Sequence, residues 1–108
     1  MMLSAIIVDD EKQLLITLKK DIETYCPSVK IIAEGSSVKT AIKLIDDLKP
    51  NVVFLDIHLG DGSGFSVLEK VEFKIFKTIF ITAYDNYAIK AFRTNAMDYL
   101  LKPYSKNE

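Results

Sequence analysis

Residues 3–10 read LSAIIVDD and residues 52–56 read VVFLD. Each stretch is an apolar run that stops at an aspartate, so one pattern occurs twice in a short chain. A run that is apolar at every position predicts a strand covered on both faces, as in a parallel sheet between two layers of helices. The two stretches therefore predict an α/β fold.

The rest of the chain alternates strand-like and helix-like patterns around these two runs. Apolar runs predict further strands at residues 29–33, 78–81 and 99–101. Helical spacing of apolar residues predicts helices over residues 14–25, 38–48 and 65–71, and a short one after Asn86. Asp10 is available to cap the first helix, and the glycine-rich residues 60–64 predict a loop. The pattern predicts five strands and four helices in a single domain, residues 1–108.

Composition limits the function further. The chain has 108 residues, 49% hydrophobic and 27% charged, which suits one small globular core. A net charge of -1 gives no electrostatic case for nucleic-acid binding by this segment. The single cysteine, Cys26, forms no intrachain disulfide and fits a reducing compartment. No signal peptide or membrane-spanning stretch occurs in the sequence, so we expect a cytoplasmic protein without a membrane partner.

Acidic side chains are predicted to meet at one edge of the sheet. Asp9 and Asp10 follow the first strand and Asp56 follows the third, and the carboxyl ends of neighbouring strands face one crevice in a doubly wound sheet. Carboxylates about 4 Å apart repel by on the order of 4 kcal/mol at an effective dielectric of about 20. A hard cation such as Mg²⁺ offsets that repulsion. Each aspartate alone is explained as a cap or a solvated loop residue, but all three together favour a metal site.

A hydroxyl and an ammonium group are predicted at the same edge. Thr82 ends the fourth strand and Lys102 ends the fifth. Each alone is explained as an ordinary residue at a strand end. With the carboxylates they suit phosphoryl transfer, in which cations neutralise the oxygens, the hydroxyl donates to one of them, and an aspartate attacks as nucleophile.

This set of residues resembles the receiver domains of response regulators in two-component systems. Such domains carry a paired acid, the phosphoacceptor aspartate, Thr or Ser, and Lys-Pro after strands one, three, four and five. Here the corresponding residues are Asp9-Asp10, Asp56, Thr82 and Lys102-Pro103. The resemblance covers nearly the whole chain and implies a flavodoxin-like, doubly wound, five-stranded parallel sheet of order 2-1-3-4-5.

The resemblance also implies a role for each acidic residue. Asp56 would accept a phosphoryl group from a sensor histidine kinase. Asp10 and Asp56 would bind Mg²⁺ directly, and Asp9 mostly through water. The backbone carbonyl of His58 would be a further ligand, while the His58 side chain is expected to be an exposed loop residue.

A conformational switch is implied as well. In the family, the threonine turns toward the phosphoryl group and an aromatic residue on the fifth strand moves inward behind it; here these are Thr82 and Tyr99. Tyr99 is also explained as a half-buried strand residue, and both can hold. Ala83 would leave room for the phosphodonor, and the Lys102–Pro103 bond would be cis.

Residues 82–88 and 98–103 resemble the receivers of LytTR-type regulators, which carry a separate DNA-binding domain downstream. Receivers have a fifth helix, and no helical apolar pattern follows Pro103, so we expect a fragment of a longer regulator with that helix truncated. The resemblance implies a homodimer face on the fourth helix and fifth strand. It also implies contact with DNA only through the downstream domain, and a role in transcription regulation.

Other functions share parts of this pattern. A haloacid-dehalogenase-like phosphatase also uses an aspartyl phosphate, Mg²⁺, Thr or Ser, and Lys, but it needs a second aspartate where this chain has His58. A phosphorylation-independent interaction module would not need the complete acidic site. Dinucleotide binding fails because no glycine-rich turn follows the first strand. The sequence thus favours a signalling receiver, which catalyses only its own phosphorylation and dephosphorylation, over an enzyme.

Overall fold

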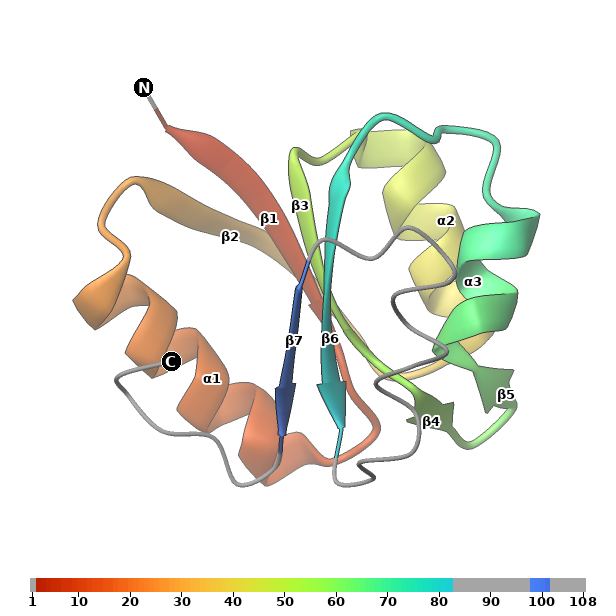
Figure 1. Cartoon of the computed structure of the whole chain (residues 1–108), viewed down its shortest axis with the longest axis horizontal. Coiled ribbons are helices and arrows are strands. Elements are labelled where there is room, and N and C mark those ends of the chain that lie inside the picture. Colours follow the sequence, from red (N-terminus) through yellow and green to blue (C-terminus); the bar gives the residue numbers. More distant parts are fainter. Residues whose placement is uncertain (1, 83–97, 102–108) are drawn as a thin grey trace.

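The computed structural model describes residues 2–82 and 98–101, with only the backbone for residues 82 and 98–101. Its centre is a parallel sheet of order β2-β1-β3-β6-β7 (Figure 1). The five strands are β1 (Leu3–Val8), β2 (Val29–Gly35), β3 (Val52–Asp56), β6 (Lys77–Thr82) and β7 (Asp98–Leu101). Because β6 and β7 are the predicted fourth and fifth strands, the predicted order 2-1-3-4-5 is confirmed.

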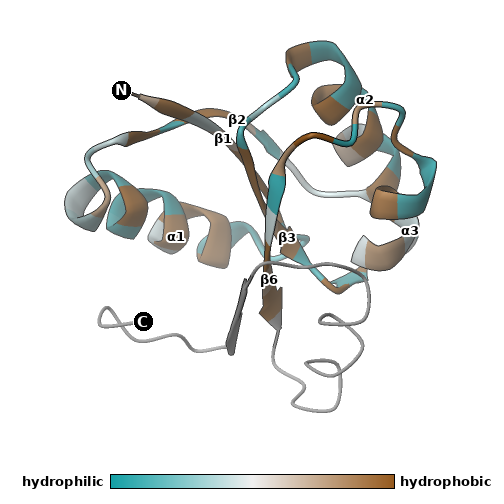
Figure 2. Cartoon of the chain, turned by 45° about the horizontal axis from the view of Figure 1, so that its top comes forward, coloured by the Kyte–Doolittle hydropathy of each residue, from teal (hydrophilic) through white to brown (hydrophobic). Residues whose placement is uncertain are grey.

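Helices cover both faces of the sheet. Helix α1 (Lys12–Tyr25) packs on one face, and α2 (Val38–Leu48) and α3 (Gly64–Lys70) lie on the other (Figure 1). Alternate residues of β1 serve the two faces: Ala5 and Ile7 pack in the cluster with α1, whereas Ile6 and Val8 pack in the cluster with α2 and α3. Figure 2 shows how strongly hydrophobic the central strands are. The expectation that the apolar runs are buried on both faces is therefore correct.

Apolar burial rather than ion pairing stabilises these layers. Phe80 is fully buried and its ring centroid lies 4.9 Å from that of Phe65. Burying one such side chain contributes about 1.5–3 kcal/mol. The ion pair between Lys19 and Glu34, at 3.3 Å, joins two side chains that stay 44% and 36% exposed. Such a pair is worth about 1 kcal/mol at most, so the core dominates.

Two local predictions were wrong. Helix α1 has Glu11, not Asp10, at its N-cap position, and the Glu11 side chain makes no cap bond. Residues 60–64 are not all loop, since β4 (His58–Leu59) and β5 (Gly62–Ser63) form a short antiparallel pair before α3 begins. Two-residue strands are too short for any periodic sequence signal to reveal them.

Helix α2 begins at a conventional cap, where the Ser37 hydroxyl accepts a hydrogen bond from the Thr40 N–H at 3.1 Å.

None of the described helices is long and apolar enough to cross a membrane. The predicted fourth helix, the Lys102–Pro103 bond and the question of a fifth helix lie outside the described residues.

Candidate functional site

The sheet brings the three predicted aspartates to one edge. Strands β1 and β3 are parallel neighbours in which Val8 lies opposite Leu55. In each strand the next residue is an aspartate: Asp9 directly follows β1, and Asp56 is the last residue of β3. Because both strands run in the same direction, both aspartates leave the sheet at its carboxyl edge, beside Asp10.

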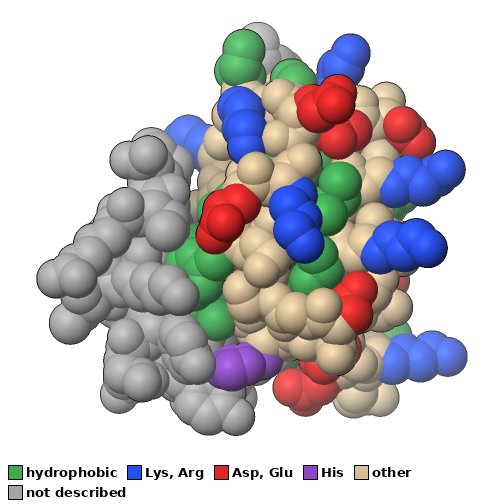
Figure 3. All heavy atoms as spheres, turned by 90° about the vertical axis from the view of Figure 1, so that its right-hand side faces the viewer, with side chains coloured by type: hydrophobic (Ala, Val, Ile, Leu, Met, Phe, Trp, Pro, Cys, Tyr) green, Lys and Arg blue, Asp and Glu red, His purple; other side chains and the backbone are tan. Residues whose placement is uncertain are grey.

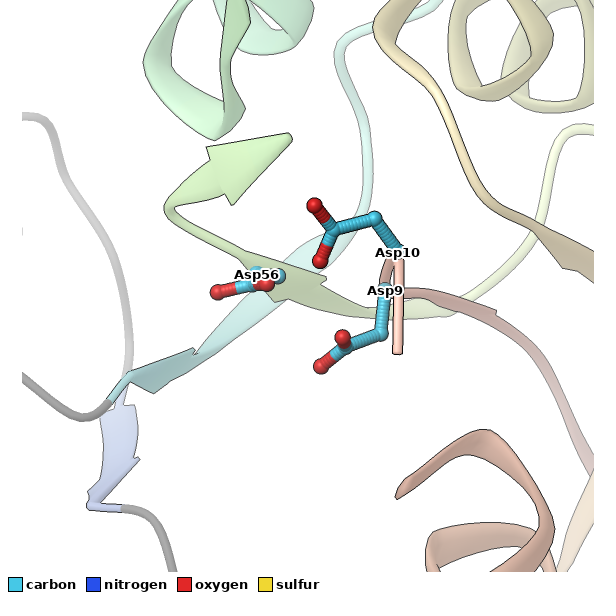
Figure 4. A group of neighbouring side chains, drawn as sticks. All are labelled: Asp9, Asp10 and Asp56. Carbon is cyan, nitrogen blue, oxygen red and sulfur yellow. The ribbon is translucent and has the colours of Figure 1, made fainter. Parts of the chain in front are cut away.

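The carboxylates form a compact group at this edge. One oxygen from each of Asp9, Asp10 and Asp56 lies within 4.8 Å of the other two, and the side chains gather around one space in Figure 4. Asp9 and Asp56 are only 1% and 4% exposed, whereas Asp10 is exposed. The predicted meeting of these three residues is therefore confirmed.

Backbone N–H groups orient the two buried carboxylates. Asp9 Oδ1 accepts a hydrogen bond from the Glu11 N–H at 2.8 Å, and Asp56 Oδ1 accepts one from the His58 N–H at 3.3 Å. The local turns after β1 and β3 thus hold the two side chains in place.

The donor set fits Mg²⁺. The group offers carboxylate oxygens, the hard ligands that this ion prefers, and Mg²⁺ binds through one or two carboxylates while it keeps several waters. Two buried carboxylates so close to a third are unfavourable as bare anions. A divalent cation at this edge would offset their repulsion.

An open cavity of about 430 Å³ adjoins the acidic group between the ends of β1 and β2 and the start of α1. Asp9, Asp10, Lys12 and Glu34 are among the residues that line it. The cavity gives solvent and small molecules a route to the acidic edge, although Asp9 itself is buried.

Sequence reasoning missed Gly64, which packs directly against Asp56. A Cβ atom on Gly64 would overlap the backbone oxygen of Asp56 and lie 3.0 Å from Leu55 Cγ. The Gly64 N–H also donates to the Ile57 carbonyl at 2.8 Å. The start of α3 therefore supports the backbone of the predicted phosphoacceptor, at a position where a side chain has no room.

The other predicted residues are only partly described. Thr82 is the last residue of β6, and Tyr99 lies in β7 opposite Phe80. Their backbones are where the sequence puts them, at the strand end and on the fifth strand, but their side chains, Lys102 and Ala83 lie outside the described part of the chain. The His58 side chain is exposed as expected, although it lies in β4 rather than in a loop.

Charges on the α2–α3 side are mixed. Figure 3 shows basic and acidic side chains interspersed over this face, with apolar side chains between them. This agrees with the net charge of -1.

The family model for the response regulator receiver domain matches residues 5–108, and the chain belongs to this family of two-component signalling proteins. It is a receiver domain and not a conventional enzyme, so the phosphatase alternative is excluded.

The chain is similar to the sensory transduction protein LytT of Enterococcus faecalis, 44% identical over 105 residues that cover 95% of this chain and 43% of that protein. LytT of Bacillus anthracis is 40% identical over 108 residues, 97% of this chain and 43% of that protein. These similarities agree with the predicted LytTR-type subfamily. The chain spans less than half the length of these relatives.

Among solved structures, a DNA-binding response regulator of the LuxR family from Staphylococcus aureus is 30% identical with a TM-score of 0.85. The match covers 97% of this chain and 90% of that one. It agrees with the fold described above.

Proposed function

We propose that this chain is a phosphorylation-controlled switch in which Asp56 accepts a phosphoryl group from a sensor histidine kinase. The observation that carries the proposal is the meeting of Asp9, Asp10 and Asp56 within 4.8 Å at the carboxyl edge of the sheet. In this proposal Asp10, Asp56 and the His58 carbonyl hold Mg²⁺ directly, and Asp9 holds it mostly through water. When bound, the ion supplies positive charge against the phosphoryl oxygens.

The reaction is a transfer from phosphohistidine to a carboxylate. An oxygen of Asp56 attacks the phosphorus, the phosphorus–nitrogen bond breaks, and the departing imidazole takes a proton from solvent. The product is an acyl phosphate on Asp56. Lys102 pairs with one phosphoryl oxygen and the Thr82 hydroxyl donates to another.

The output follows from the same contacts. Thr82 turns toward the phosphoryl group and Tyr99 moves inward behind it, which changes the face that β7 is expected to form with the predicted fourth helix. That face serves a homodimer. We take residues 1–108 as one receiver domain of a longer cytoplasmic transcription regulator whose DNA contacts come from a further domain, because the chain spans 43% of each LytT relative.

Metal binding tests the site. Asp10→Ala should weaken Mg²⁺ binding about tenfold or more, and Asp9→Ala should weaken it less, because Asp10 is a direct ligand and Asp9 acts through water. Calorimetric titration of Mg²⁺ into each variant gives the dissociation constants. Asp21→Ala, on α1, is the control and should titrate like the wild type. Equal constants for the wild type and Asp10→Ala would refute the ligand assignment.

Thr82→Ala should separate phosphorylation from signalling. The variant keeps Asp56 and should still take a phosphoryl group, but it lacks the hydroxyl that couples the group to Tyr99. Amide NMR spectra before and after acetyl phosphate should show smaller shifts in β7 than in the wild type. Thr24→Ala, which removes a hydroxyl on α1 that donates to the Lys20 carbonyl at 2.9 Å, is the control. Equal shifts in Thr82→Ala and the wild type would contradict the coupling.

A further inference from the structure

Asp61 links the turn between β4 and β5 to the start of α2. Its Oδ1 accepts a hydrogen bond from the Val38 N–H at 2.7 Å, and its Oδ2 accepts one from the Lys39 N–H at 3.2 Å. Val38 and Lys39 are the first two residues of α2, whose N–H groups have no partner within the helix. The side chain of the N-cap residue Ser37 accepts from the N–H of Thr40, one turn into the helix. Asp61 therefore accepts from the two N–H groups that the Ser37 cap does not bind.

The segment that Asp61 anchors is directly connected to the acidic site. Asp61 lies in the turn between β4 and β5, which pair through His58 with Ser63 and Leu59 with Gly62. Strand β4 begins two residues after Asp56. Figure 1 shows this pair at the end of the sheet where β3 finishes. Any shift of the turn therefore moves the backbone that follows the phosphoacceptor.

The segment has little stability of its own. Two strands of two residues make an isolated hairpin that is unstable in water. Glycines flank Asp61 on both sides, and a Cβ atom at Gly60 would meet nothing within 4 Å. Glycine has the largest conformational entropy to lose on ordering. The segment therefore depends on tertiary contacts to hold one conformation.

The Asp61 carboxylate accepts charge-assisted hydrogen bonds. The backbone hydrogen bond from Val38 is the main cause that lowers the pKa of the Asp61 carboxyl below its ordinary value of 3.8. The group is thus ionised at neutral pH, and hydrogen bonds to an ionised acceptor are shorter and stronger than neutral ones. A negative charge at the N-terminus of α2 is also favoured by the helix dipole.

We propose that Asp61 is a positioning residue for the metal site: its carboxylate anchors residues 57–62 to α2 and so holds the His58 carbonyl in place beside Asp56. This inference rests on the proposed function, since it assigns a role in metal binding and phosphorylation. Asp61 touches neither the metal nor the phosphoryl group, and acts through the backbone of β4.

The chain offers a matched control at the other end of the same helix. Asp46 of α2 accepts hydrogen bonds from the Glu72 and Phe73 N–H groups at 2.9 Å and 3.0 Å. Like Asp61, it joins α2 to a following segment through two backbone donors. Its contacts lie beyond α3, away from the carboxyl edge, so its loss affects stability without moving β4.

The experiment compares Asp61→Ala, Asp61→Asn and Asp46→Ala with the wild type by Mg²⁺ calorimetry and by the rate of phosphorylation with acetyl phosphate. Asp61→Ala should weaken Mg²⁺ binding about three- to tenfold, less than the roughly 10–100-fold typical of residues that hydrogen-bond directly to a metal ligand, because Asp61 acts only through the backbone of β4. Asp61→Asn keeps one acceptor for the Val38 N–H and should have a smaller effect. The phosphorylation rate of Asp61→Ala should approach that of the wild type at saturating Mg²⁺, because the defect is in metal affinity.

Asp46→Ala should bind Mg²⁺ like the wild type. If Asp61→Ala and Asp61→Asn also bind Mg²⁺ like the wild type, Asp61 is only structural and the inference is overturned. If Asp61→Ala does not fold, the Mg²⁺ affinity of Asp61→Asn decides. A weakened affinity supports the inference, and an unchanged affinity overturns it. Failure of the wild type to bind Mg²⁺ or to take a phosphoryl group would instead refute the proposed function.

Discussion

Asp56→Asn is expected to abolish phosphorylation by acetyl phosphate while the protein stays folded. The amide has nearly the same shape as the carboxylate, and its oxygen can still accept the hydrogen bond that the His58 N–H donates at 3.3 Å. It is not a nucleophile toward phosphorus, because it lacks the negative charge of the carboxylate. Intact-mass spectrometry after incubation with Mg²⁺ should detect one added phosphoryl group in the wild type and none in the variant.

The matched control is Asp47→Asn, which changes an exposed aspartate on α2. It should be phosphorylated like the wild type. Phosphoryl groups that persist on Asp56→Asn would contradict the assignment of the acceptor. A wild type that takes no phosphoryl group from any donor would favour the phosphorylation-independent module instead.

Gly64→Ala is expected to lower both stability and the phosphorylation rate. The added methyl group overlaps the backbone oxygen of Asp56 and crowds Leu55, so α3 or the end of β3 must move. Overpacking of this kind costs about 1–3 kcal/mol. A displaced Asp56 backbone also takes the acceptor out of line with Asp9 and Asp10. Urea unfolding measures the first effect, and the initial rate with acetyl phosphate at saturating Mg²⁺ measures the second.

Gly60→Ala, in the nearby turn between β4 and β5, is a suitable control, because nothing lies within 4 Å of a Cβ atom at Gly60. Its free energy of unfolding should be unchanged or slightly higher, since alanine restricts the unfolded chain. Equal stabilities and rates for the two variants would show that the close packing at Gly64 does not support Asp56.

The strands and the acidic edge were predictable because they follow from periodic patterns, whereas the strand order came from the resemblance to receiver domains. Runs such as residues 52–56 are apolar throughout, which indicates a strand buried on both faces. Parallel strands then deliver their terminal residues to one edge whatever the details of packing. Asp9, Asp10 and Asp56 could therefore be brought together from their positions after strands alone, and the structure places them within 4.8 Å.

The contacts that support this edge were decided by the tertiary structure. Asp61 accepts from Val38 and Lys39, more than twenty residues earlier in the chain, and Gly64 meets the Asp56 backbone only after α3 has folded against β3. The N-cap position of α1 also differs from the expected one, since it is occupied by Glu11 rather than Asp10. The contacts of Asp61 and Gly64 depend on the relative placement of two elements to within an ångström or so. Hydrophobic periodicity specifies which face an element buries, but it does not specify that placement, which side-chain packing sets.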